Sequence, residues 1–241
     1  MTDLGEIIGE DRWGARRLAA LTARERTLYA SILQRFGRDG PGQPGAAGHA
    51  GDDDADALAG LVERDLVGVD DDGAVVVAYP FSARATRHRV DIDDGRRLWA
   101  MCAVDAFAIP YLVCRPGAIH AREPDTDRPV RVTIDPGSAT LAWDPTGAIV
   151  LAARDGGGRV AECACPHINL FASRAAAERY LDVPGRRGRL LSIPEAAAAA
   201  RAIFAGLFEL LAAPSSIGVN AGGRRVAGGR RVAGGVRSGQ P

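Results

Sequence analysis

Apolar side chains recur every three or four positions near the start of the chain, which predicts a helix from about Ala23 to Phe36. The apolar positions of this helix are Leu28, Ile32, Leu33 and Phe36. Thr22 and Glu25 have the spacing of a capping box, in which each side chain satisfies a backbone N–H at the helix start. Gly37 is expected to end the helix.

The next segment predicts a short helix followed by a β-hairpin. Asp54 is placed to cap the helix, and residues 66–82 hold two β-branched runs around an Asp-Asp-Asp-Gly turn. Helices followed by a hairpin are typical of a winged helix, so we expect a winged-helix-like N-terminal domain over residues 1–82. Because the turn is triply acidic, it would repel a phosphate backbone, which argues against DNA binding.

The pattern changes after residue 82 and predicts short strands mixed with separated helices. Expected strands cover residues 87–92, 130–134, 140–143, 148–153, 159–165 and 190–193. The strand at 140–143 is expected to pair between the strands at 130–134 and 148–153. Expected helices cover residues 96–108, 174–181 and 194–213. This mixture favours an α+β fold, with a small mixed second domain over residues 83–213.

Composition narrows the class of protein. The chain of 241 residues is 46% hydrophobic and 25% charged with a formal net charge of zero, which is ordinary for a globular protein and unlike a nucleic-acid binder. No apolar run reaches membrane-spanning length, and four cysteines are too few for a secreted disulfide scaffold. We therefore expect a cytoplasmic protein without a membrane partner. Residues 214–241 repeat Ala-Gly-Gly-Arg-Arg-Val and are expected to be a disordered tail.

Few residues stand in a setting that suggests chemistry. Nucleotide-binding loops and a nucleophile elbow are absent from the sequence. One open alternative is a zinc site built from His120, Cys163, Cys165 and His167, although one residue between the two cysteines is fewer than zinc sites usually have.

The stretch from Leu98 to Pro110 is the most informative. If it is helical, Cys102 and Asp105 share one apolar face at i, i+3 spacing. Burial there would raise the pKa of the carboxyl group, as a proton donor near neutral pH requires. The alternatives are that Cys102 is a buried small hydrophobe and that Asp105 pairs with an arginine.

Two segments carry a family resemblance. The run from Val90 to Asp105, continued by Ile109-Pro110, and the run from Cys165 to Ser173 resemble the alkylmercury lyases. The resemblance covers about residues 15–212. It implies that Cys102, Asp105 and Cys165 cleave a carbon–mercury bond without an organic cofactor, and that the same groups hold the Hg²⁺ product. It also implies an organomercurial substrate, external thiols that remove Hg²⁺, and hand-off to a mercuric reductase or to free thiols.

The sequence departs from the family pattern at a few positions. Pro166 stands where the family often has a second cysteine, Ala121 replaces another, and Cys114 and Cys163 have no assignable counterpart. In an extended segment Cys163 and Cys165 would point to the same face, and the family register favours Cys165. Two other classes of protein stay open: a soft-metal binding or delivery protein, and a winged-helix metal-responsive regulator.

Overall fold

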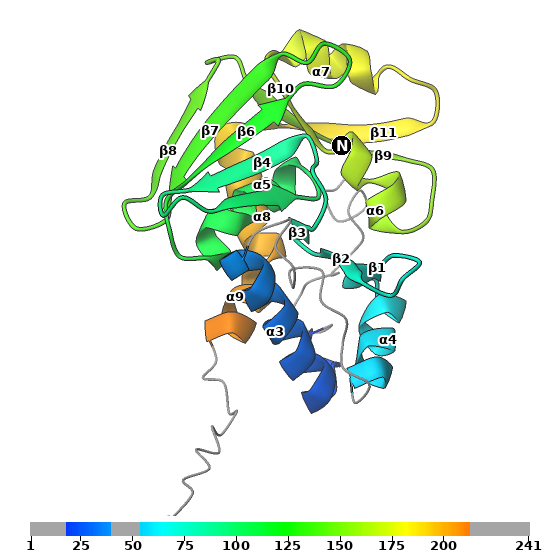
Figure 1. Ribbon diagram of the computed structural model, residues 1–241. Helices are drawn as coiled ribbons and strands as arrows, with labels where there is room; N and C mark the ends of the chain where they lie inside the picture. The colour runs from blue at the N-terminus through cyan, green and yellow to red at the C-terminus, as the bar shows by residue number, and fades with distance from the viewer. Residues whose placement is uncertain (1–17, 40–53, 213–241) are drawn as a thin grey trace, which may run out of the picture.

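The computed structural model describes residues 18–39 and 54–212 (Figure 1). The predicted tail at 214–241 lies outside these residues. The described part is a mixed α+β fold, which confirms the predicted class.

An eight-stranded antiparallel sheet forms the body of the molecule. Its strand order is β1-β2-β3-β5-β4-β6-β7-β8. The strands are β1 (Val67–Val69), β2 (Val75–Ala78), β3 (Phe81–Ser82), β4 (His88–Ile92), β5 (Arg97–Ala100), β6 (Gly117–Arg122), β7 (Pro129–Asp135) and β8 (Thr140–Asp144). Burial alternates along β4 and β6, so one face of the sheet packs on the core and the other meets solvent.

A second, smaller sheet stands beside the first. It has the order β10-β9-β11, with β9 (Ile149–Asp155), β10 (Asn169–Phe171) and β11 (Arg186–Ser192), all antiparallel. Helix α7 (Arg174–Leu181) covers one face, and its small residues pack with Leu151 and Phe171 in a separate apolar cluster. The strand β9 is buried over five successive residues because both of its faces are covered.

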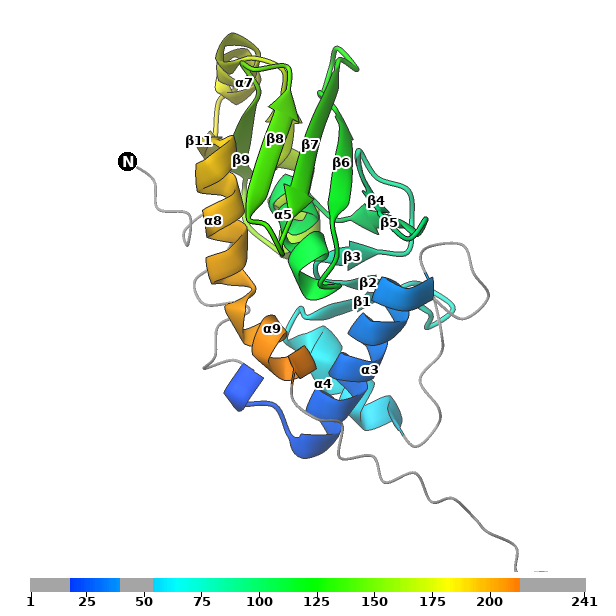
Figure 2. The ribbon, with the colours of Figure 1, turned by 90° about the vertical axis from the view of Figure 1, so that its left-hand side faces the viewer.

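Helix α5 (Ala103–Leu112) lies against the inner face of the large sheet (Figure 2). Eight successive residues from Ala103 to Pro110 are buried, as expected of a helix that is apolar on every side except at Asp105. Helix α8 (Ile193–Ile203) packs on α5. Helix α9 (Ala205–Ala212) follows α8 after a break at Phe204. None of the described helices combines the length and apolar character needed to cross a membrane.

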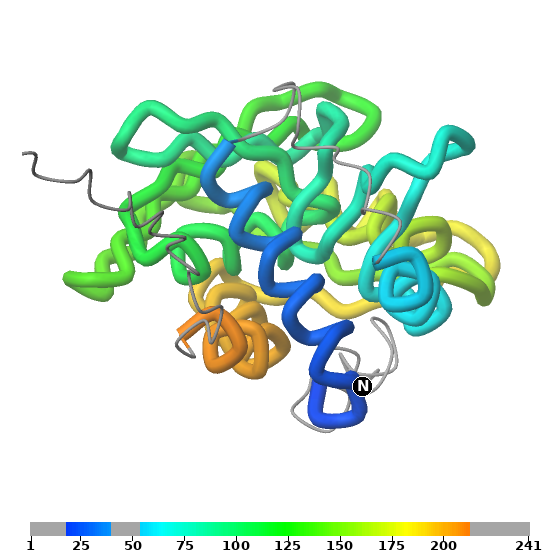
Figure 3. The backbone as a smooth tube through the Cα atoms, turned by 60° about the horizontal axis from the view of Figure 1, so that its bottom comes forward, coloured from blue at the N-terminus to red at the C-terminus, as the bar shows by residue number. Residues whose placement is uncertain are grey.

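The N-terminal helices α3 (Ala23–Asp39) and α4 (Ala55–Glu63) pack below the sheet, where α3 passes between α4 and α9 (Figure 3). The predicted capping box forms: the Thr22 N–H donates to Glu25 at 2.7 Å, and the Glu25 N–H donates to the Thr22 hydroxyl at 3.1 Å. Glu25 also pairs with Arg64 at 2.9 Å. The helix continues through Gly37, so the predicted stop there is wrong.

The predicted hairpin forms from β1 and β2, and its turn places Gly73 at φ 77°, a conformation that favours glycine. Its strands then continue through β3 into the large sheet, since Phe81 pairs with Ala100. The winged-helix interpretation and the domain division at residue 82 stay predictions.

Several local predictions are wrong, and pairing between distant strands explains most of them. Residues 97–100 form β5 between β3 and β4, so the predicted helix over 96–108 begins only at Ala103 and continues through Pro110. Strand β8 pairs with β7 but not with β9, which joins the second sheet. The predicted strand over 159–165 is instead the short helix α6 (Val160–Cys163) and a 3₁₀ turn, η2 (Cys165–His167). Strands β6 and β10 were not expected.

The capping box predicts a measurable stabilisation. We expect Thr22→Ala to lower the free energy of unfolding by about 1 kcal/mol, because the Glu25 backbone N–H at the start of α3 loses its hydroxyl acceptor. Urea denaturation measures this change. Thr27→Ala is the control, since the Thr27 hydroxyl donates only to the Ala23 carbonyl within the helix. Equal losses in the two variants would contradict the role of the cap.

Candidate active site

Cys102 lies where the large sheet passes into helix α5. It is the N-cap residue, with an extended backbone at φ −150° and ψ −179°. The neighbouring Met101 N–H donates to the Pro80 carbonyl at 3.1 Å, and the Ala103 N–H donates to the Ile168 carbonyl at 2.9 Å. These two bonds fix the backbone of Cys102 between the sheet and the segment that follows η2.

Asp105 is the third residue of α5. Its carboxyl group accepts hydrogen bonds from the backbone N–H and the thiol of Cys102, as the acidic residue of a capping box does. Its Oδ2 atom is buried without a hydrogen-bond partner among the described residues. Cys102 and Asp105 are therefore adjacent through an N-cap relation, and the predicted location of both on one helix face is wrong.

Cys165 reaches the same place from the second sheet. It begins the η2 turn, and the Ile168 N–H donates to its carbonyl at 3.3 Å. Asn169 is the first residue of strand β10, and its buried side chain donates to the Pro166 carbonyl at 2.7 Å. Pairing of β10 with β9 thus fixes the turn that carries Cys165.

The three side chains form one compact cluster. Their sulfur and carboxylate oxygen atoms all lie within 4.8 Å of one another, and the residues are only 3%, 2% and 3% exposed. A metal bound between two opposed thiolates needs a sulfur–sulfur separation of about 4.6 Å if each bond has the ~2.3 Å length known for zinc. One soft metal ion could therefore bridge Cys102 and Cys165 with the carboxylate beside it.

Burial dominates the electrostatics of the cluster. Desolvation raises the pKa of Asp105 to about 7, although the hydrogen bonds from Cys102 act in the opposite direction. Desolvation also raises the pKa of Cys102 well above its ordinary value, and the neighbouring Cys165 and Asp105 add to the effect. The resting site therefore holds protons that a bound metal would displace.

Apolar side chains close the cavity around the cluster. The lining residues besides the cluster itself are Val104, Val160, Ile168 and Phe204. Phe204 lies at the break between α8 and α9, and Val160 begins α6, where its N–H donates to Asp65 at 3.3 Å. These residues were not predicted from the sequence, because an isolated apolar position carries no sign that it lines a site.

The remaining cysteines and histidines lie elsewhere. Cys163 is buried on α6, with its thiol directed to the Gly158 carbonyl at 3.5 Å, and Cys114 is exposed. His167 contacts the Tyr180 hydroxyl at 3.0 Å, and His120 pairs with Asp91 at 3.4 Å. Within the described residues these groups do not join Cys165 in a metal cluster, so the alternative zinc site is not assembled.

Fold and site together define an α+β protein with a buried dithiol–carboxyl centre suited to a soft metal. The family model described as "MerB: Alkylmercury lyase" matches residues 81–205. The chain belongs to the alkylmercury lyase family, as the resemblance predicted.

Individual relatives agree with this assignment. The chain is 30% identical over 114 residues to an alkylmercury lyase of Staphylococcus epidermidis, which covers 46% of this chain and 51% of that protein. It is 26% identical over 155 residues to an alkylmercury lyase of Pseudomonas putida, with 64% and 72% covered. The matches to the first relatives thus span about half of their length.

The fold is also similar to a solved structure, the mercury-bound form of MerB2. The TM-score is 0.63 at 20% identity, covering 88% of this chain and 100% of that chain.

The raised pKa of Asp105 predicts a pH-dependent cost to stability. As pH rises from about 4 towards 7, the unfolded chain loses this proton while the folded chain keeps it, so the free energy of unfolding falls. Asp105→Asn removes this titration. We expect the stability of Asp105→Asn relative to the unmodified protein to increase by roughly 2–4 kcal/mol between pH 4.5 and pH 7.5 in urea denaturation.

The exposed Asp71 provides the control for this measurement. Asp71→Asn should keep the pH dependence of the unmodified protein. An Asp105→Asn stability difference that is the same at both pH values would show that the carboxyl group is not desolvated.

Proposed function

We propose that the protein is an organomercurial lyase that cleaves the carbon–mercury bond of R–Hg⁺ by protonolysis. One proton is consumed, and the products are the hydrocarbon R–H and Hg²⁺. The observation that supports this most directly is the cluster itself: two thiols and a carboxyl group of raised pKa lie within 4.8 Å of one another in a buried cavity. Membership of the alkylmercury lyase family supports the same activity.

The proposed reaction begins with the two thiols. Cys102 and Cys165 lose their protons and bind mercury as thiolates, the soft ligands that suit a soft metal. The second thiolate increases electron density on mercury and weakens its bond to carbon. The proton of neutral Asp105 then moves to carbon as the mercury–carbon electron pair becomes the new C–H bond. Mercury stays in the divalent state, bound to two thiolates beside the Asp105 carboxylate.

The surroundings of Asp105 suit this role. A carboxylic acid with a pKa of about 7 is about half protonated at neutral pH, which balances availability of the proton against ease of transfer. The apolar walls formed by Val104, Ile168 and Phe204 keep water from the reacting carbon.

Release of the product requires groups from outside the site. We propose that external thiols take Hg²⁺ from the two thiolates, either free or on a mercuric reductase, and that no organic cofactor takes part. Because the reaction needs reduced sulfur, a reducing compartment such as the cytoplasm suits it, and all four cysteines are free. We further propose that residues 1–82 act as a structural domain, with Val160 of the cavity wall anchored to Asp65.

A soft-metal delivery protein is the second candidate function, and the two thiols alone would serve it. Asp105 discriminates between the two, because binding alone does not need a buried carboxylic acid. The decisive experiment is incubation with phenylmercury and excess thiol, followed by measurement of benzene. Benzene from the unmodified protein supports the lyase, whereas mercury binding without benzene identifies the delivery protein.

Substitution of Asp105 tests whether its carboxyl group supplies the proton that the carbon receives. We expect Asp105→Asn to lower benzene release by about 10²–10⁴-fold, the range for loss of a general acid, while mercury still binds at one ion per chain. Asp71→Asn is the charge-matched control and should keep full activity. Benzene release at the original rate in Asp105→Asn would show that the proton comes from another group.

Paired cysteine variants test which thiol of the second segment reacts. Cys165→Ser should lose nearly all cleavage because mercury loses one of its two thiolates. Cys163→Ser should keep most of it, because the Cys163 thiol is directed to the Gly158 carbonyl and lies outside the cluster. Benzene formation by each purified variant measures the effect. The reverse outcome would move the site to Cys163.

A further inference from the structure

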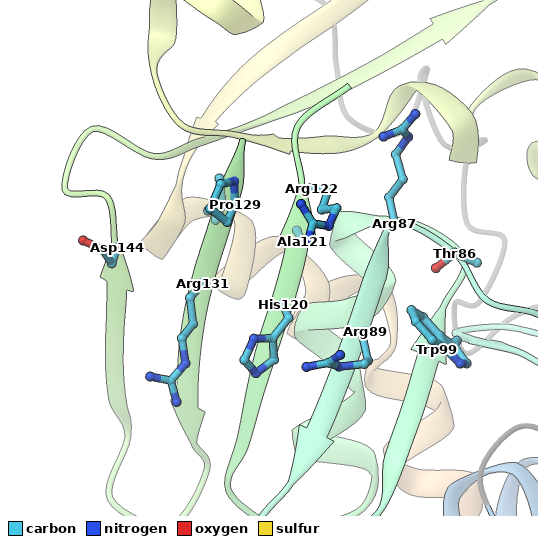
Figure 4. A pocket seen from close by; sticks show the side chains of 11 residues that line it. Thr86, Arg87, Arg89, Trp99, His120, Ala121, Arg122, Pro129, Arg131 and Asp144 are labelled. Carbon is cyan, nitrogen blue, oxygen red and sulfur yellow. The ribbon is translucent and has the colours of Figure 1, made fainter. Parts of the chain in front are cut away.

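The outer face of the large sheet carries a second cavity, with a volume of about 480 Å³ (Figure 4). It lies on the face opposite to α5, because Trp99 alternates with the buried Leu98 and Ala100 along β5. A cavity of this size is within the range of small-molecule sites, which is roughly 300–1,000 Å³. It is separate from the cysteine cluster, and the proposed reaction does not use it.

Strand register aligns the central side chains of this cavity in one row. Arg89 of β4 is directly opposite Trp99 of β5 on one side and His120 of β6 on the other. His120 is in turn directly opposite Arg131 of β7. Figure 4 shows these four side chains next to one another across four strands. Directly opposed residues on one face lie about 5 Å apart at Cβ, so a ligand placed over one residue of the row can contact its neighbours on the adjacent strands.

This row concentrates positive charge. Four arginines and His120 line the cavity, against Asp144 as the one carboxylate among the lining residues. Arg89 and Arg131 stand on either side of His120, two strands apart, so the repulsion between their like charges is an electrostatic cost in the free protein. Asp91 offsets part of it, since it pairs with Arg89 at 2.9 Å and with His120 at 3.4 Å.

Arg131 has no such compensation. It is exposed, and no hydrogen bond or ion pair joins its guanidinium group to another residue of the described chain. Although Asp144 is directly opposite in register, the Arg131 side chain points away from it in Figure 4. Arg131 therefore offers its planar, five-donor group to a ligand.

Trp99 adds a different type of surface at the other end of the row. Its half-buried indole lies beside Arg89 and Thr86 in Figure 4. A flat aromatic group next to guanidinium groups suits a planar ring, which can stack on the indole while an attached acidic group contacts the arginines.

We propose that this cavity binds a small organic anion in which a carboxylate or phosphate group is attached to a planar ring. The acidic group lies between Arg89 and Arg131 over His120, and the ring lies against Trp99. Binding would relieve the repulsion that Asp91 leaves uncompensated in the row.

Calorimetric titration of the full chain tests the proposal with defined probes. Phthalate presents carboxylates on a ring, and adenosine monophosphate presents a phosphate attached to a ring system. We expect one or both to bind saturably at one per chain, and the comparison identifies the preferred acidic group. Adenosine and inorganic phosphate, which lack the acid and the ring respectively, should bind at least tenfold more weakly.

Matched variants localise the binding. Arg131→Gln should weaken it at least tenfold, whereas Arg187→Gln, which removes an exposed arginine from β11 of the other sheet, should leave it unchanged. Absence of saturable binding of both probes, or equal weakening by the two substitutions, would overturn the proposal. Both variants should cleave phenylmercury at the original rate, so this result is independent of the proposed lyase activity.

His120 provides a direct spectroscopic signal. Burial lowers its pKa, and the charges of Arg89, Arg131 and Arg97 act in the same direction, while Asp91 alone opposes them. A bound anion should therefore raise the pKa of His120 in an NMR titration. An unchanged His120 titration in the presence of saturating probe would place the anion elsewhere on the molecule.

Discussion

Desolvation of the Asp105 carboxyl group is the constraint on which the chemistry of this site depends. At the start of α5 an ionised carboxylate would be favoured by the helix dipole and by the Cys102 N–H. Burial outweighs both, and the group keeps its proton to about pH 7. The free energy that the fold loses by burying this acid raises its pKa into the range that the proposed proton transfer requires.

That burial depends on contacts between segments far apart in the chain. The Ala103 N–H to Ile168 carbonyl bond joins the first turn of α5 to the turn that carries Cys165. Asn169 and strand β10 fix the same turn against β9, and Phe204 closes the cavity from the junction of α8 and α9. The site is thus assembled at the boundary between the two sheets. Two thiols from different elements can approach there without belonging to one rigid helix.

The sequence allowed prediction of local features that a few neighbouring residues determine. The capping box at Thr22 and Glu25, the hairpin with its Asp-Gly turn, and helix α7 are of this type. Residues 97–100 show the limit: their apolar pattern suits a helix, but pairing with β3 and β4 makes them a strand. Periodicity alone carries no information on such distant partners.

The candidate site was predictable for a different reason. Cys102, Asp105 and Cys165 were selected by resemblance to a family, and the structure brings all three together. The burial of Asp105 agrees with the prediction, but its geometry does not, since Cys102 precedes the helix as its N-cap residue and does not share a helix face with Asp105. The apolar lining could not be predicted, because Val160 and Phe204 differ from other core residues only in their location.

The alternation of side chains along β4, β5 and β6 allows one sheet to serve two environments. Val90, Leu98 and Ile119 point to the core beside α5, while their neighbours Arg89, Trp99 and His120 line the outer cavity. Because successive residues lie on opposite faces, the apolar set that supports α5 and the cationic set on the outer face can change independently. A shift of register by one residue would exchange them and would bury arginines against α5. The core beside α5 and the outer cavity therefore both require the observed strand register.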